Sequence, residues 1–237
     1  MPPDAPFALA KAAFALAAVP VRYVVEGHRW AQAAALEAQP RSFPWDRFLI
    51  GPAMIHFARA LGRIHSGDLT GSAREVAELE SLRDRLKKEG TGYDWSTVAE
   101  TLRLEAAGWL ANARGRRAEA GELLRRAADL EDSTEKNAVT PGAIVPAREQ
   151  LAGFLLEAGH PADALREYES ALRSAPNRFN GLYGAGRAAE NSGQPAKARA
   201  YYQSLLAISD PASRRPEVAE AKAFVARPAP AGPTRLP

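Results

Sequence analysis

Apolar residues recur along this chain at helical rather than strand spacing. Trp30, Ala33 and Leu36, for example, form one stripe along a helix face. Alanine, the best helix former, is abundant, and no long segment is rich in β-branched residues. The pattern therefore predicts an all-α fold with almost no sheet.

The clearest signal is an internal repeat. A shift of 34 residues aligns six identical pairs: Gly159/Gly193, Pro161/Pro195, Ala162/Ala196, Ala164/Ala198, Tyr168/Tyr202 and Leu172/Leu206. A helix–turn–helix unit of 34 residues is the period of the tetratricopeptide repeat. The two segments therefore predict two consecutive helical hairpins.

The aligned residue types suit such a hairpin. Gly159 would end the first helix in a left-handed conformation, and Pro161 would open the second helix, where its missing N–H costs little. Ala164 would lie where two helices cross closely, and Tyr168 would fill the space one turn later. Gly186, seven residues before Gly193, provides a second close contact.

The same template fits upstream around Gly115 and Gly67, and poorly around Gly27, which has Pro20 seven residues before it and Gln32 five after it. The gaps between successive turn glycines are 40, 48, 44 and 34 residues. We therefore expect an α-solenoid domain over residues 1–226 with a capping helix at 216–226. The expected hairpins cover about 5–38, 46–89, 95–131, 145–175 and 179–209. A disordered, proline-rich tail is expected over 227–237.

The chain resembles the C-terminal half of a group of bacterial tetratricopeptide repeat proteins. The stretches that carry the resemblance are Phe14–Tyr23, His56–Gly62 with Ser66–Asp68, Glu131–Lys136 with Val139–Gly142, and Pro176–Phe179 with Leu182–Gly184. The resemblance covers about residues 7–226. It implies an α-solenoid and no particular reaction.

In this repeat class the first helices of the hairpins line a groove that binds protein or peptide segments. We expect a scaffold of this kind, without catalysis and without a cofactor. The residues predicted to face the groove, counted from the turn glycines, are Phe57, Glu105, Trp109, Asn112, Glu149, Asn180, Tyr183 and Arg187. Packing of Phe57 and Trp109 against the next helix is an equally good interpretation.

Few residues suggest other chemistry. Cysteine is absent, and none of the four histidines forms a pair at metal-ligand spacing. Gly184–Ala189 formally matches a dinucleotide fingerprint but lies in a predicted helix rather than after a strand. The net charge of +3 is spread along the chain and does not favour nucleic acid. The alternative is an enzymatic or metal-dependent site built from His56 and the loop 133–145.

The segment Phe7–Val25 is apolar, but Lys11 and Pro20 interrupt it, so it predicts neither a membrane span nor a signal peptide. A buried helix pair is the better interpretation, and the expected compartment is the cytoplasm. An apolar face of the first helix left uncovered predicts self-association through the N-terminal helix.

Overall fold

The computed structural model describes residues 5–89, 93–134 and 142–228, and these residues form helices and turns with no strand. The predicted all-α class is confirmed. The chain forms two compact units, Met1–Ala147 and Arg148–Pro237, and each is described by itself. The tail from residue 229 and the centre of the loop 133–145, residues 135–141, lie outside the described residues. A single domain over 1–226 stays a prediction.

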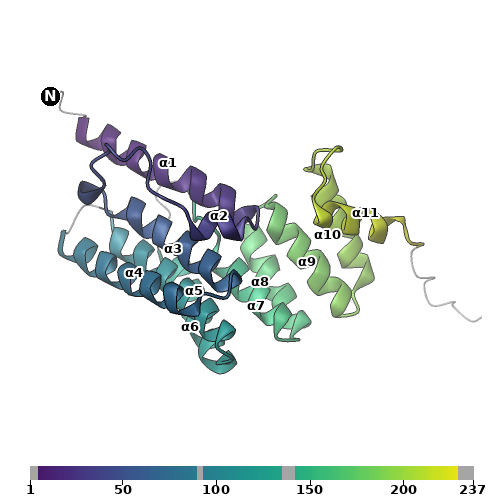
Figure 1. The fold of residues 1–237 in the computed structure, drawn as a ribbon. Helices are drawn as coiled ribbons and strands as arrows, with labels where there is room; N and C mark the ends of the chain where they lie inside the picture. Colours follow the sequence, from purple (N-terminus) through teal and green to yellow (C-terminus); the bar gives the residue numbers. More distant parts are fainter. Residues whose placement is uncertain (1–4, 90–92, 135–141, 229–237) are drawn as a thin grey trace, which may run out of the picture. The chain divides into compact units, whose positions relative to one another are not determined.

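Unit 1 is built around α3, which packs against α1, α2, α4 and α5, while α6 packs against α5 (Figure 1). The elements are α1 (Ala5–Glu26), α2 (Trp30–Ala34), the short 3-10 helix η1 (Trp45–Arg47), α3 (Ile50–His65), α4 (Leu69–Glu89), α5 (Trp95–Ala113) and α6 (Arg117–Ser133). The core of the unit lies around α3, because the neighbouring helices bury their apolar stripes against it.

In unit 2, α9 packs against α8 and α10, and α10 packs against α11. The elements are α7 (Ala147–Glu157), α8 (Pro161–Ser174), α9 (Phe179–Asn191), α10 (Pro195–Ala207) and α11 (Pro216–Ala226). Pro161, Pro195 and Pro216 each occupy the first turn of a helix. The capping helix predicted at 216–226 is present as α11.

The turns inside the hairpins share one geometry. Gly67, Gly115, Gly159 and Gly193 have φ values between 72° and 84°, which confirms the predicted left-handed glycines. The residue after each glycine donates its N–H to a carbonyl five residues earlier, as from His160 to Leu155 at 2.9 Å. This arrangement satisfies carbonyls that the end of a helix would otherwise leave without partners.

The first hairpin has the same turn, shifted by one residue. Its left-handed residue is His28, with φ 52°, and not Gly27. Counted from His28, the residues at minus seven and plus five are Val21 and Ala33, both fully buried. The poor fit of this hairpin to the template therefore comes from the position of the left-handed residue, which is His28 and lies one residue after Gly27.

Pro20 does not end a helix. It lies inside α1, a helix of 22 residues that continues past Pro20 to Glu26. The expected helix pair over Phe7–Val25 is therefore wrong, and the segment is one helix. Proline removes one hydrogen bond from a helix, and its ring crowds the carbonyl four residues earlier. The burial of Ala17, Val21 and Val24 on the same helix stabilises it across this interruption.

Small residues lie where the template places them. Ala120, Ala164 and Ala198 are completely buried. A Cβ at Gly184 would lie 2.2 Å from the Tyr168 ring, and one at Gly186 would lie 2.5 Å from the Tyr202 ring. The two glycines of the formal dinucleotide motif are therefore packing positions within α9.

The left-handed glycines give a direct test of the turn geometry. Gly159→Ala is expected to lower the free energy of unfolding by about 1–2 kcal/mol, because an L residue in this conformation is strained. A Cβ there would meet nothing within 4 Å, so no steric clash adds to the strain. Urea unfolding measures the change. The control Gly142→Ala, in equally open space and without a left-handed φ, should be neutral; an equal loss there would contradict the explanation.

Candidate binding surface

Two residues of the predicted groove lie in the interior of unit 1. Phe57 on α3 and Glu105 on α5 both have 0% exposure, so neither lines an open surface, and this part of the expectation is corrected. The reason is the packing around both helices: α3 contacts α1, α2, α4 and α5, and α5 contacts α3, α4 and α6. Trp109 and Asn112 are half-buried, and Trp109 packs against the same core as Phe57.

Part of this core comes from a segment distant in sequence. Ile144 and Val145, which follow the undescribed part of the loop, are about 95% buried and belong to the core that contains Phe57. The guanidinium of Arg22 on α1 donates to the backbone carbonyls of Gly142 and Ala143, the latter at 2.9 Å. Unit 1 therefore holds an irregular stretch of its own chain by its carbonyls and by two apolar side chains.

In unit 2, Glu149 is buried and structural. Its carboxylate pairs with the guanidinium of Arg178 at 2.9 Å, which joins α7 to the residue that precedes α9. Gly181 provides the room, because a Cβ there would lie 3.0 Å from the Glu149 carboxylate. Glu149 therefore stabilises the packing of the helices and presents little surface to a partner.

Asn180, Tyr183 and Arg187 share one face of α9. Asn180 accepts a hydrogen bond at 3.1 Å from Arg215, the residue before α11. Tyr183 donates to Glu220 of α11 at 2.5 Å and accepts from Arg187 at 3.2 Å. The start of α11 thus covers part of this face of α9. Arg187, at the other end of the face, is exposed to solvent.

The surroundings of Tyr183 and Arg187 keep the phenol neutral and the guanidinium charged. Burial raises the pKa of Tyr183, and its hydrogen bond to the Glu220 carboxylate raises it further, so the phenol stays neutral. The hydrogen bond to Tyr183 raises the pKa of Arg187, which remains a cation. The face therefore offers a fixed positive donor beside an aromatic ring whose centroid lies 5.8 Å away.

Arg22 and Arg187 are equivalent in the two units. Each lies six residues before the left-handed residue of its hairpin, His28 and Gly193 respectively. The hairpins between them carry Leu61, Trp109 and Gly153 at this position. Sequence reasoning found Arg187 but missed Arg22, because counting from Gly27 places Val21 there. The signal was present and needed a shift of one residue.

The histidine singled out by the sequence, His56, belongs to a polar cluster between α3 and α4. Its Nδ1 lies 2.6 Å from the carboxylate of Glu75, which also accepts from Arg63 at 3.0 Å. Burial alone would raise the pKa of Glu75, but the hydrogen bond with His56 and nearby cations outweigh it and lower the pKa. In unit 2, Arg148 and Glu167 form a pair with the same separation of 19 residues, at 2.6 Å.

A polar pair at this separation thus joins the two helices of a hairpin in each unit. In the described part of the chain, no group of three or more histidine, aspartate or glutamate side chains is arranged to hold a metal ion. The loop 133–145, the other half of the alternative site, is mostly outside the described residues.

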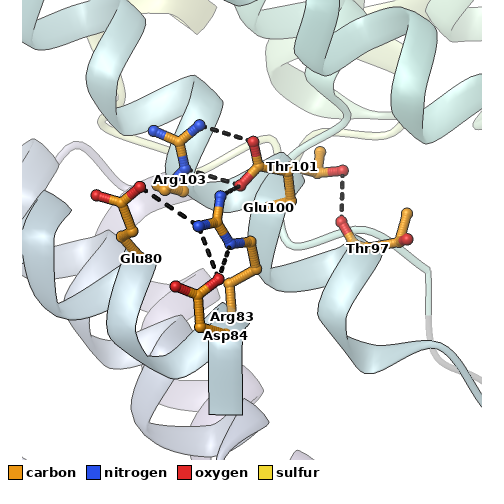
Figure 2. A network of polar contacts seen from close by, with 7 residues as sticks. All are labelled: Glu80, Arg83, Asp84, Thr97, Glu100, Thr101 and Arg103. Atoms are coloured by element: carbon orange, nitrogen blue, oxygen red, sulfur yellow. Dashed lines mark hydrogen bonds and ion pairs between the residues drawn. The ribbon is translucent and has the colours of Figure 1, made fainter. Parts of the chain in front are cut away.

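A second network joins α4 to α5 (Figure 2). Glu100 accepts from Arg83 at 2.8 Å and from Arg103 at 2.6–2.7 Å. Arg83 also pairs with Glu80 and Asp84 on its own helix. Because the Glu100 carboxylate lies between two guanidinium groups, the network stabilises the packing of α4 against α5.

In the described residues, the geometry defines an all-helical protein in which helices of each unit pack on one another. No family model, no curated protein and no solved structure matches the chain. Among the described helices, none has the length and apolar character needed to cross a membrane.

Proposed function

We propose that the chain is a tetratricopeptide-type scaffold that binds a segment of a partner protein on α9, the first helix of its last hairpin. The common turn geometry, the fully buried alanines and the 34-residue spacing of the last two hairpins support this repeat type. The function is non-catalytic binding, and the face formed by Tyr183 and Arg187 is the proposed contact surface.

One observation carries the proposal. Arg22 binds two successive backbone carbonyls of an irregular segment, and Arg187 presents the same donor group at the equivalent position of the last hairpin. Within the described residues, Arg187 donates only to Tyr183 and is exposed to solvent. Its outer N–H groups can therefore bind a carbonyl or carboxylate of a partner.

The contacts of Arg22 also indicate what kind of segment would bind. Carbonyls are common to every peptide, so such an arginine recognises the backbone, and neighbouring side chains provide selectivity. In unit 1 that selectivity comes from Ile144 and Val145, which follow the small residues Gly142 and Ala143. For unit 2 we expect a segment whose carbonyl or carboxylate lies on Arg187 and whose apolar side chain packs beside Tyr183.

A peptide library displayed on phage and selected on the purified protein tests the proposal. Selected peptides are then synthesised with a fluorescent label, and their affinities are measured by anisotropy. Arg187→Glu should weaken their binding at least about tenfold, equivalent to 1.4 kcal/mol. The change replaces a cationic donor with an anionic acceptor, which repels the carbonyl or carboxylate of the peptide. Circular dichroism should show unchanged helicity, since Arg187 is exposed.

The matched control is Arg173→Glu, an exposed arginine near the end of α8, which should leave affinity unchanged. Failure to enrich any peptide, or equal affinities for Arg187→Glu and the wild type, would remove this surface from the proposal.

A further inference from the structure

The outer face of α1 carries an exposed apolar stripe. Among the described residues, the large hydrophobic side chains classed as exposed are Leu16, Val19, Tyr23 and Ile208, so three of the four lie on one helix. Their spacing of three and four residues places Leu16, Val19 and Tyr23 along one side. Val19 is 68% exposed and Tyr23 is 58% exposed. Solvent-exposed stripes of this kind mark interaction surfaces.

The opposite side of α1 is already used. Ala13, Ala17 and Val21 are fully buried, and α1 packs against α3. The stripe is therefore additional to the core of unit 1. The guanidinium of Arg29 lies 4.4 Å from the centroid of the Tyr23 ring, which restricts the orientation of this ring and reduces the entropy lost on binding.

The stripe is suited to a second copy of itself. Residues 12–21 carry no charge, while Lys11 lies before them and Glu26 lies at the end of the helix. An antiparallel pair centred on Val19 brings Lys11 of one copy near Glu26 and the negative end of the helix dipole in the other. A parallel pair would oppose Lys11 to Lys11, so the charges favour the antiparallel arrangement.

We propose that the chain forms a twofold-symmetric dimer in which α1 packs antiparallel to α1 of a second copy through Leu16, Val19 and Tyr23. Such an interface is self-complementary, because the same patch faces itself across the axis. Exposed Ala12 and Ala15 beside the stripe allow the two helices to approach closely. The surface differs from the peptide-binding face on α9, so each proposal can fail alone.

Sedimentation velocity from low to high micromolar concentration tests the dimer. The wild type should show a reversible monomer–dimer equilibrium, and Val19→Glu should weaken the association at least about tenfold, because it buries a like charge on both sides of the axis. Ile208→Glu is the matched control, since Ile208 is an exposed apolar residue (43%) outside the stripe. A wild type that stays monomeric, or equal effects of the two variants, would overturn the proposal.

Cross-linking locates the axis independently. The chain has no cysteine, so Val19→Cys introduces the only thiol. Near a twofold axis, two such residues come within the roughly 7 Å Cα separation that a disulfide requires. Oxidation should give a covalent dimer with Val19→Cys and little with Ile208→Cys. Equal yields from both variants would show random collision and contradict the assigned interface.

Discussion

Replacing Gly184 with alanine is expected to lower the free energy of unfolding by about 2 kcal/mol, although alanine is the better helix former by about 1 kcal/mol. The Cβ would lie 2.2–2.5 Å from three atoms of the Tyr168 side chain. Tyr168 is buried, so its ring cannot move into solvent without cost. Urea unfolding followed by circular dichroism measures the loss.

The clash can be separated from other effects by a double-mutant cycle. Tyr168→Leu removes the outer ring atoms that the new methyl group would strike, at the cost of a cavity. The double variant Gly184→Ala/Tyr168→Leu should therefore be more stable than the sum of the two single losses predicts. Additive losses, or a stabilised Gly184→Ala, would show that Tyr168 does not determine glycine at this position.

The sequence predicted the turns well because each is determined by residues close together in the chain. Gly159 and Gly193 have the conformation that only glycine adopts without strain, and Pro161 and Pro195 start the next helices. The first hairpin was less visible because His28 occupies the left-handed position that glycine holds elsewhere. A polar residue there gives no recognisable signal, and the neighbouring Gly27 places the template one residue out of register.

The groove residues were harder to predict, because facing a groove depends on contacts distant in sequence. The template assigns Phe57 and Glu105 to a surface, but the packing around α3 and the burial of Ile144 and Val145 place both in the core of unit 1. Arg22 and Gly142 are 120 residues apart. No local pattern predicts such a contact, whereas Asn180, Tyr183 and Arg187 lie on one helix face by periodicity alone.

The second large effect is expected at Glu100, where Glu100→Gln should lower the free energy of unfolding by about 2 kcal/mol at neutral pH. The amide keeps the shape of the side chain but loses the charge that Arg83 and Arg103 share. It also presents an NH₂ group to one of them. The side chains of Glu100, Arg83 and Arg103 are 19%, 23% and 16% exposed, so water screens this loss only in part.

The matched control is Glu119→Gln, which removes the charge of an exposed i,i+3 pair with Arg116. Pairs of this kind contribute about 0–1 kcal/mol, so the control should differ little from the wild type. Equal losses in the free energy of unfolding for the two variants would mean that the network around Glu100 does not stabilise the packing of α4 against α5.

The pH dependence of this difference gives an independent test. Burial alone would raise the pKa of Glu100, but hydrogen bonds from Arg103 and Arg83 outweigh it and hold the pKa below its usual value of 4.5. The group binds a proton more weakly in the folded state, so its contribution is complete above pH 4.5 and is lost as the pH falls through the folded pKa. Glu100→Gln lacks this contribution at every pH. The stability gap between wild type and variant should therefore stay constant above pH 4.5 and narrow below it, whereas a gap that persists in acid would assign the loss to packing rather than to charge.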